Sequence, residues 1–165
     1  MLDFGCGTGK YVIHLQNRGV KVTGLDLNSP EIEEALRDEA KGCVTLYNGE
    51  LPLPFPENHF DVVMTTEVLE HIEDAALILA ELKRITKRTF LMTVPDGSGV
   101  PRCHSDNVIP WHFLEETHVN FFTQKALTTL LEPHWEAVQI YKFGITELPN
   151  SFFANNLACV CEIPQ

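Results

Sequence analysis

Residues 2–9 read Leu-Asp-Phe-Gly-Cys-Gly-Thr-Gly, a short apolar strand that runs directly into a glycine-rich turn. The following residues, 10–18, carry Val12 and Leu15 at helical spacing, and Gly19 then supplies a C-terminal stop. Glycines in such a turn tolerate positive φ and let a ligand approach the backbone amides. This succession of strand, glycine turn and helix predicts a nucleotide-cofactor site.

The next strand narrows the class of cofactor. Residues 20–26 are rich in β-branched side chains and end in Asp26, about 20 residues after the turn, where a ribose-binding carboxylate is expected. A dinucleotide fingerprint has two residues between its second and third glycines, whereas only Thr8 separates them here. A P-loop needs a Ser or Thr after its lysine, but Tyr11 occupies that position. The spacing therefore disfavours an NAD(P)-dependent oxidoreductase, which stays an alternative, and a P-loop.

Three further motifs follow the glycine turn along the chain. They are Gly-Leu-Asp at 24–26, Leu-Pro-Phe-Pro-Glu-Asn-His-Phe-Asp-Val-Val at 53–63, and Glu-Val-Leu-Glu-His-Ile at 67–72. In content, order and spacing these motifs resemble the class I S-adenosylmethionine-dependent methyltransferases. The likeness runs over nearly the whole chain and is most specific in its first two thirds. It implies S-adenosyl-L-methionine as the cofactor and methyl transfer as the reaction.

Strands alternate with helices along the chain, which predicts an α/β, doubly wound, Rossmann-like fold with helices on both faces of a mostly parallel sheet. Further strands are expected at 44–47, 60–66 and 89–94, and further helices at 29–42, 74–86 and 123–133. The last two strands, 135–143 and 156–163, are joined only by a loop, so the last strand is antiparallel. The resembled family has a seven-stranded sheet of order 3-2-1-4-5-7-6.

Length and composition predict a single domain over residues 1–165, because the chain is 44% hydrophobic and long enough for one buried core. The resembled family carries helices before its first strand, whereas this sequence starts at that strand. We therefore expect the usual N-terminal helices to be lacking. Their absence keeps open a non-catalytic methyltransferase-like scaffold, although the intact glycine turn and Asp26 argue against it.

The resemblance places the cofactor at the carboxyl ends of the strands, where ligands of open α/β sheets bind. Asp26 would hold the ribose, Leu27 would pack against the adenine, and Glu50 would reach the adenine edge. The full set of implied cofactor-binding residues is Asp3, Gly5, Cys6, Gly7, Gly9, Asp26, Leu27, Glu50, Leu51, Thr65 and Thr66.

Two histidines are the candidate catalytic residues. The sulfonium already carries a good leaving group, so methyl transfer needs mainly alignment of the acceptor. An oxygen acceptor must also lose a proton, and a histidine within reach is the most frequent base. His71 and His118 are therefore predicted to be catalytic, although His71 could equally pack against or cap the turn before the helix at 74–86. We expect O-methylation of a small molecule or saccharide.

Residues 95–122 form a long segment with little periodicity, and we expect it to cover the acceptor side of the site. Its end, at 116–123, resembles bacterial methyltransferases that act on sugars or other small hydroxylated acceptors. Trp111 and Phe113 could stack on such an acceptor or simply close the core.

A metal-assisted variant of the reaction is an alternative. The set Glu67, Glu70, His71 and His118 resembles the metal-binding residues of some O-methyltransferases, where a divalent cation would orient the acceptor hydroxyls. The same Glu-x-x-Glu-His string occurs in relatives without a metal, so no metal ligand is assigned. Cys103 and His104 also lack the paired spacing of a zinc site.

The net charge of the chain indicates which kinds of partner it can bind. Twelve basic and 23 acidic residues give a formal charge of -11, which would repel a phosphate backbone, and no nucleic-acid partner is predicted. The basic residues at 83–88 are explained by a helix C-terminus, where the helix dipole favours cations. Five cysteines without repeated spacing, and no long apolar stretch, predict a cytoplasmic protein with free thiols and no membrane partner. A homo-oligomer stays open.

Overall fold

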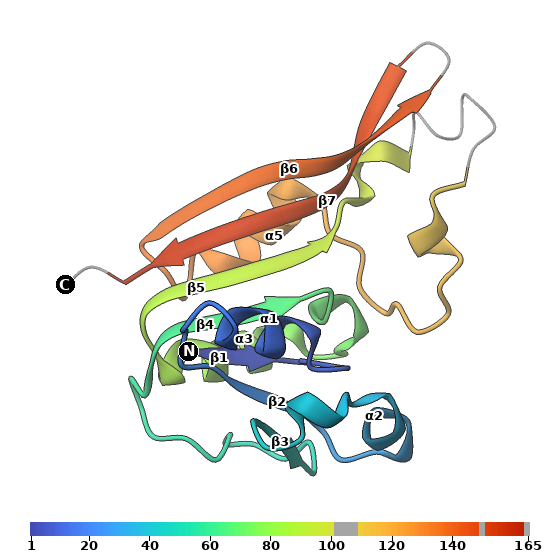
Figure 1. The fold of residues 1–165 in the computed structure, drawn as a ribbon. Helices are drawn as coiled ribbons and strands as arrows, with labels where there is room; N and C mark the ends of the chain where they lie inside the picture. The colour runs from blue at the N-terminus through green and yellow to red at the C-terminus, as the bar shows by residue number, and fades with distance from the viewer. Residues whose placement is uncertain (101–108, 149–150, 164–165) are drawn as a thin grey trace.

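A computed structural model describes residues 1–100, 109–148 and 151–163, which build a seven-stranded sheet with helices on both faces (Figure 1). The strands are β1 (Leu2–Phe4), β2 (Thr23–Leu27), β3 (Val44–Tyr47), β4 (Phe60–Thr66), β5 (Thr86–Pro95), β6 (Ala137–Leu148) and β7 (Ser151–Glu162). The α-helices are α1 (Lys10–Gln16), α2 (Pro30–Ala35), α3 (Ala75–Ile85) and α5 (Gln124–Leu131). Short 3-10 turns are η1 (Asp38–Ala40), η2 (Leu69–His71), η3 (Gly97–Gly99) and η4 (Trp111–Phe113).

The order of the strands is β3-β2-β1-β4-β5-β7-β6, which confirms the predicted order. Strand β1 is parallel to both β2 and β4, and β7 is antiparallel to both β5 and β6. The strand order therefore reverses beside β1, and the carboxyl ends of β1, β2 and β4 meet at one edge of the sheet. Open α/β sheets bind their ligands at such a switch point.

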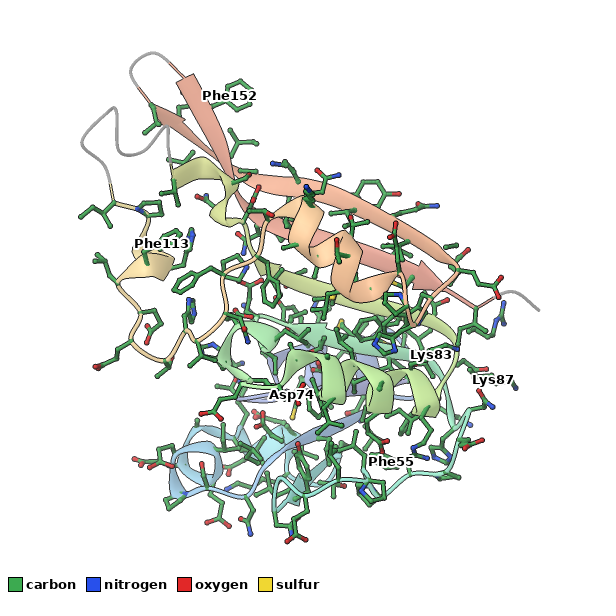
Figure 2. All side chains as sticks on the ribbon, turned by 180° about the vertical axis from the view of Figure 1, so that it is seen from behind. Phe55, Asp74, Lys83, Lys87, Phe113 and Phe152 are labelled. Carbon is green, nitrogen blue, oxygen red and sulfur yellow. The ribbon has the colours of Figure 1, made fainter. Side chains whose placement is uncertain are left out.

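Helices α3 and α5 lie on one face of the sheet and α1 lies on the other (Figures 1 and 2). Helix α3 begins after Asp74, whose Oδ1 accepts a hydrogen bond of 2.9 Å from the backbone N–H of Leu77. Its buried side chains, which include Ile78, Leu82 and Ile85, recur at helical spacing. Helix α3 therefore presents one apolar stripe to the sheet, and this stripe fixes the helix over the core.

The second helix is shorter than predicted. Ser29 caps it as expected, since its Oγ accepts from the N–H of Ile32 at 3.3 Å, but α2 ends at Ala35 and not near Gly42. Leu36 is extended, with ψ of 124°, and the next N–H, that of Arg37, donates to the carbonyl of Thr8 at 3.1 Å. The prediction of a helix over 29–42 was wrong because this tertiary contact ties the chain to the glycine turn.

The other elements differ from the predictions mainly in length. Helix α1 ends at Gln16, and β2 covers 23–27 in place of 20–26. Strand β5 is longer than 89–94, and the final hairpin spans 137–148 and 151–162 in place of 135–143 and 156–163. The hairpin continues because Gly144, at φ of 69°, stays within the paired strand. Its far end projects beyond β5 (Figure 1).

Candidate cofactor and acceptor site

A cavity of about 630 Å³ lies at the carboxyl ends of β1, β2, β3 and β4. This volume falls within the range of roughly 300–1,000 Å³ that is usual for small-molecule sites. The lining residues that come from β2, β3 and the segments after them are called here the β2–β3 end: Asp26, Leu27, Tyr47, Gly49 and Leu51. The lining residues on and around α3 are called here the α3 end: Glu67, Val68, His71, Ile72, Asp74, Leu77, Ile78 and Thr117.

The glycine turn holds two parts of the site together. Gly5 and Gly9 have φ of 73° and 72°, and a Cβ at Gly5 would overlap the side chain of Val68. A Cβ at Gly9 would overlap the methyl group of Ala40, whereas a Cβ at Gly7 would meet nothing within 4 Å. Two of the glycines are therefore needed for close packing, and Gly7 leaves open space beside its backbone.

Asp26 sits at the cavity wall and is held by backbone amides. The N–H of Gly7 donates to its Oδ2 at 2.6 Å, and the N–H of Leu27 donates to its Oδ1 at 2.7 Å. Each carboxylate oxygen can accept more than one hydrogen bond, so these contacts orient the group without exhausting it. Asp26 and Leu27 both line the cavity, and their contacts with a cofactor stay predictions.

Asp3 is the most unusual polar residue near the turn. Its side chain is fully buried, and neither carboxylate oxygen has a hydrogen-bond partner among the described residues. Burial raises the pKa of Asp3 to about 6, and the nearby charge of Asp26 adds to the rise. A buried carboxylate without partners is unfavourable for the folded protein. Asp3 itself is not part of the cavity wall.

Other predicted cofactor residues lie beside the cavity and not on its wall. Cys6 is buried, and burial, followed by the charges of Asp26 and Asp3, raises the pKa of its thiol to about 12, so the thiol is neutral. Thr65 is buried and its Oγ1 has no partner in the described part of the chain, while Thr66 is half-buried.

Glu50 is exposed, and its Oε2 accepts from the side-chain amide of Asn48 at 2.8 Å. Its two neighbours in the chain, Gly49 and Leu51, line the cavity at the β2–β3 end. The predicted contact of Leu51 with the site therefore has a geometric basis, whereas the carboxylate of Glu50 is hydrogen-bonded to Asn48.

Glu67 follows β4 in a left-handed backbone conformation, with φ of 54°. Its N–H donates to the carbonyl of Thr93 at 3.0 Å, and its Oε2 accepts from the side-chain amide of Asn156 at 2.8 Å. Its other oxygen, Oε1, is buried and has no hydrogen-bond partner among residues 1–100, 109–148 and 151–163. Glu67 therefore lines the cavity with one carboxylate oxygen engaged by Asn156 and the other closed to solvent.

The two predicted catalytic histidines come together. The rings of His71 and His118 lie 4.7 Å apart and 72° to each other, and His71 lines the cavity. The Nδ1–H of His71 donates to the carbonyl of Thr117 at 3.2 Å, and the Nδ1–H of His118 donates to the carbonyl of His112 at 2.9 Å. Because carbonyls only accept, these contacts set the tautomer of each neutral ring.

Glu70 lies beside the histidine pair. It is buried, and its Oε2 has no partner within the described ranges. Burial raises the pKa of Glu70 to about 7, and the charge of Glu67 contributes to the rise. Ligand atoms of Glu70, His71 and His118 all lie within 4.8 Å of one another, whereas Glu67 is not in this group.

Part of the predicted cover segment docks on η2. The side-chain amide of Asn120 donates to the carbonyls of Leu69 and Ile72 at 3.2 and 2.6 Å, and the N–H groups of Val119 and Asn120 donate to the carbonyl of Glu70. Figure 2 shows this segment, marked by Phe113, at the same end of the sheet as Asp74. The cover thus reaches the cavity through Thr117. Residues 101–108, which include Cys103 and His104, and the side chain of Trp111 lie outside the described part.

Comparison with known proteins agrees with this geometry. Residues 2–91, more than half of the chain, match the family described as methyltransferase domain. The chain belongs to this family of S-adenosylmethionine-dependent methyltransferases.

Two relatives illustrate the match of this methyltransferase domain. An uncharacterized methyltransferase of Schizosaccharomyces pombe is 39% identical over 101 residues, which are 53% of this chain and 36% of that protein. A ubiquinone biosynthesis O-methyltransferase of Rhodopseudomonas palustris is 32% identical over 101 residues, 57% of this chain and 38% of the relative. The chain therefore spans less than half the length of these relatives.

Among solved structures, a SAM-dependent methyltransferase from Archaeoglobus fulgidus has the same fold. Its TM-score is 0.77, with 18% identity, and the match covers 98% of this chain and 85% of that one. The predicted family and fold class are both confirmed.

Several residues that line the cavity, or that hold the 95–122 segment beside it, were not found from the sequence. Leu77, Tyr47 and Val68 line the cavity, and Asn120 anchors the cover. One signal existed for Leu77, because it is an apolar residue off the stripe that Ile78, Leu82 and Ile85 form at helical spacing. The polar role of Asn120 has no signal in the sequence, since its two acceptors are backbone carbonyls about fifty positions away.

Of the basic residues at 83–88, Lys83 and Arg84 lie in the last turn of α3 as predicted, whereas Lys87 and Arg88 lie on β5. Figure 2 shows Lys83 and Lys87 at the opposite end of α3 from Asp74. Arg84 is paired with Glu81 at 2.5 Å, and Lys87 lies 3.8 Å from Asp61. No helix in the described part of the methyltransferase domain is long and apolar enough to cross a membrane.

Proposed function

We propose that this domain carries out S-adenosylmethionine-dependent methylation of an oxygen atom on a small molecule or saccharide. The observation that carries the proposal is the cavity at the switch point of the sheet, with Asp26 fixed on its wall by the glycine turn. The name of the Rhodopseudomonas relative, an O-methyltransferase, supports oxygen as the acceptor atom. Methyl transfer from a sulfonium needs mainly alignment of the acceptor with the methyl group, and few catalytic side chains are required.

The residues at the β2–β3 end suit the adenosyl part of the cofactor. Asp26 would accept from the ribose hydroxyls, and the apolar side chains of Leu27, Tyr47 and Leu51 would pack on the adenine. Asp3, with its buried carboxylate lacking described partners, would balance the positive charge of the methionine end. When bound, the cofactor supplies an electrophilic methyl group on a sulfonium that is already a good leaving group.

The histidine pair suits removal of the acceptor proton. His71 lines the cavity, and its Nδ1–H is held by the carbonyl of Thr117, which leaves Nε2 as the basic nitrogen of the neutral ring. His118 packs edge-on against this ring and would fix its orientation. We assign proton acceptance to His71, which lines the cavity, and a positioning role to His118.

A second candidate is the metal-assisted form of the same reaction. It is favoured by the convergence of ligand atoms from Glu70, His71 and His118 within 4.8 Å, together with the buried Glu70 oxygen that has no described partner. These donors fit a divalent cation of the kind that binds imidazole and carboxylate. A bound cation would orient acceptor hydroxyls and lower their pKa. Glu67 would be a weaker member, because Asn156 already holds its Oε2.

Transfer of labelled methyl groups from S-adenosylmethionine to a panel of hydroxylated acceptors tests the function. His71→Ala should lower turnover by about 100-fold, the usual share of general base catalysis, with nearly unchanged cofactor affinity. His14→Ala, an exposed histidine on α1, is the control. Unchanged turnover in His71→Ala would contradict the assigned role, and turnover that vanishes with a chelator and returns with added Mg²⁺, Mn²⁺ or Zn²⁺ would favour the metal-assisted form.

Two alternative functions, a non-catalytic scaffold and an NAD(P)-dependent oxidoreductase, are distinguished from the proposed methyltransferase by ligand binding. A scaffold binds neither S-adenosylhomocysteine nor NADH at the cavity. An oxidoreductase binds NADH and not S-adenosylhomocysteine.

A further inference from the structure

The 3-10 turn η2, which carries His71, has few hydrogen bonds of its own. It is three residues long, and the residue before it is Val68, whose side chain cannot cap it. The N–H of His71 donates to the carbonyl of Val68 at 3.0 Å, and the N–H of Ile72 donates to the carbonyl of Leu69 at 3.3 Å. So short a turn does not hold its conformation alone. The orientation of His71 therefore depends on the segment that packs against η2.

Asn120, from the 95–122 segment, bridges this turn. Its side-chain amide donates to the carbonyls of Leu69 and Ile72 at 3.2 and 2.6 Å and so uses both of its N–H groups. Leu69 precedes His71 in the chain and Ile72 follows it, so one amide group fixes the backbone on both sides of the histidine. Asn120 is half-buried, and hydrogen bonds that are shielded from water are stronger than exposed ones.

The ring of His71 is fixed by the same segment. The carbonyl of Thr117 accepts from the Nδ1–H of His71 at 3.2 Å, and the ring of His118 lies edge-on at 4.7 Å. Because a carbonyl only accepts, the proton of the neutral His71 ring lies on Nδ1, and Nε2 carries the lone pair. His71 is exposed at the α3 end of the cavity, and Nε2 is its open nitrogen. The contact with Thr117 thus selects the tautomer that can accept a proton from a ligand.

Two backbone bonds complete the contact between the segment and the turn. The N–H groups of Val119 and Asn120 donate to the carbonyl of Glu70 at 2.8 and 3.0 Å. The turn thus has more hydrogen bonds to this segment than within itself. If the segment leaves η2, the ring of His71 also loses its acceptor at Thr117. A neutral imidazole without a fixed partner exchanges between its two tautomers, and only one of them has a basic Nε2.

We propose that Asn120 is a positioning residue for the base: it docks residues 117–120 on η2 and thereby holds His71 with Nδ1–H on the Thr117 carbonyl and Nε2 open to the acceptor. Docking of the segment and readiness of the base are then one event. Proton acceptance breaks the O–H bond of the acceptor and forms Nε2–H, while Nδ1–H stays on the carbonyl, so the imidazolium keeps its orientation. This inference rests on the proposed function, in which His71 takes the proton. Asn120 itself is not part of the cavity wall.

The tautomer of His71 tests the inference without any turnover. Nitrogen-15 NMR of histidine-labelled protein, above about pH 8 where an ordinary histidine is neutral, distinguishes a protonated from an unprotonated ring nitrogen. The native protein should show a single tautomer with the proton on Nδ1, and His71→Ala identifies the signals. Asn120→Ala should show exchange between the two tautomers.

An isosteric variant and a matched control separate positioning from packing. Asn120→Asp keeps the shape of the side chain, but a carboxylate cannot donate to the carbonyls of Leu69 and Ile72, so it should show the same exchange as Asn120→Ala. Asn17→Ala, at an exposed asparagine after α1, should leave the His71 signals unchanged. A single native tautomer in both Asn120 variants would overturn the inference.

Turnover with labelled S-adenosylmethionine gives a second test. Asn120→Ala should lower kcat about tenfold, a part of the about 100-fold expected for His71→Ala, and change the KM for S-adenosylmethionine less than about twofold. In a protein that already carries His71→Ala, the same substitution should cause no further loss, because Asn120 acts through His71. Losses that multiply in the double variant would assign Asn120 a separate structural role and overturn the inference.

The two tests also distinguish this inference from the proposed function. If the native protein methylates no hydroxylated acceptor, the proposed function fails, and the tautomer of His71 still decides the role of Asn120. If the native protein transfers methyl groups and the Asn120 variants keep both the native tautomer and the native kcat, only the positioning role fails.

Discussion

Replacement of Asp3 by asparagine should stabilise the free protein. The pKa of Asp3 is about 6, against an ordinary value of 3.8, chiefly because the carboxylate is buried. The two pKa values differ by about 2 units, and each unit corresponds to about 1.4 kcal/mol. The charged carboxylate therefore lowers the free energy of unfolding by about 3 kcal/mol at a pH where it is ionised in both the folded and the unfolded state. An asparagine side chain at this position carries no charge, so the variant would not suffer this loss.

The sign of the pH dependence follows from the two pKa values. Below pH 3.8 the carboxyl is neutral in both the folded and unfolded states, and burial of the charge has no effect on stability. As the pH rises from 3.8 to 6 the unfolded state ionises first, so the native protein loses stability. Above pH 6 the loss is complete. The advantage of Asp3→Asn should therefore be below about 1 kcal/mol at about pH 4 and reach about 3 kcal/mol at about pH 8.

Urea unfolding at both pH values measures this difference, and the melting temperature at about pH 8 should rise by about 6–12 °C. Asp61→Asn is the control, because Asp61 is also on the sheet but its side chain is 68% exposed. The same substitution at Asp3 should weaken binding of S-adenosylhomocysteine. If Asp3→Asn were less stable than the native protein at the higher pH, or if the difference in stability did not change with pH, burial would not destabilise the charged form of Asp3.

Two further substitutions test the packing that shapes the site. Gly5→Ala should destabilise the fold by about 1–3 kcal/mol, because the φ of 73° is unfavourable for alanine and the new methyl group would overlap Val68. Urea unfolding measures the loss, and Val68→Ala in the same protein should restore part of it. An unchanged free energy of unfolding in Gly5→Ala would contradict this packing. Asn120→Ala removes the hydrogen bonds to Leu69 and Ile72 and should lower the free energy of unfolding by about 1–3 kcal/mol. Amide hydrogen exchange should become faster in the 95–122 segment and in η2. Unchanged exchange would show that these bonds do not hold the segment in place.

The sequence was a good guide to the sheet, because strands and helices depend on local patterns. β3 and β4 were placed at their observed bounds, 44–47 and 60–66, since each is a short apolar run between breaking residues. The hairpin was placed but its length was not, because Gly144 and the polar residues near the turn resemble a loop locally. Only pairing with a neighbouring strand extends such residues into β structure.

The site was less predictable because it depends on contacts between distant segments. The position of Asp26 at the end of β2 follows from the strand pattern, and its ribose contact stays a prediction. The packing role of Gly5 against Val68 could not be read from the turn alone, since the partner is more than sixty positions away. The buried state of Asp3, and the buried oxygen of Glu67, arise from the surrounding fold and leave no mark in local sequence.

We propose that the cavity beside Asp26 binds the S-adenosyl cofactor. Calorimetric titration of the purified protein with S-adenosylhomocysteine, with NADH as the control ligand, measures this binding. We expect saturable binding of S-adenosylhomocysteine alone, and a loss of about 1–3 kcal/mol in binding free energy for Asp26→Ala, because the ribose hydroxyls would lose their acceptor. Binding of NADH instead, or equal affinity of Asp26→Ala and the native protein for S-adenosylhomocysteine, would contradict the claim.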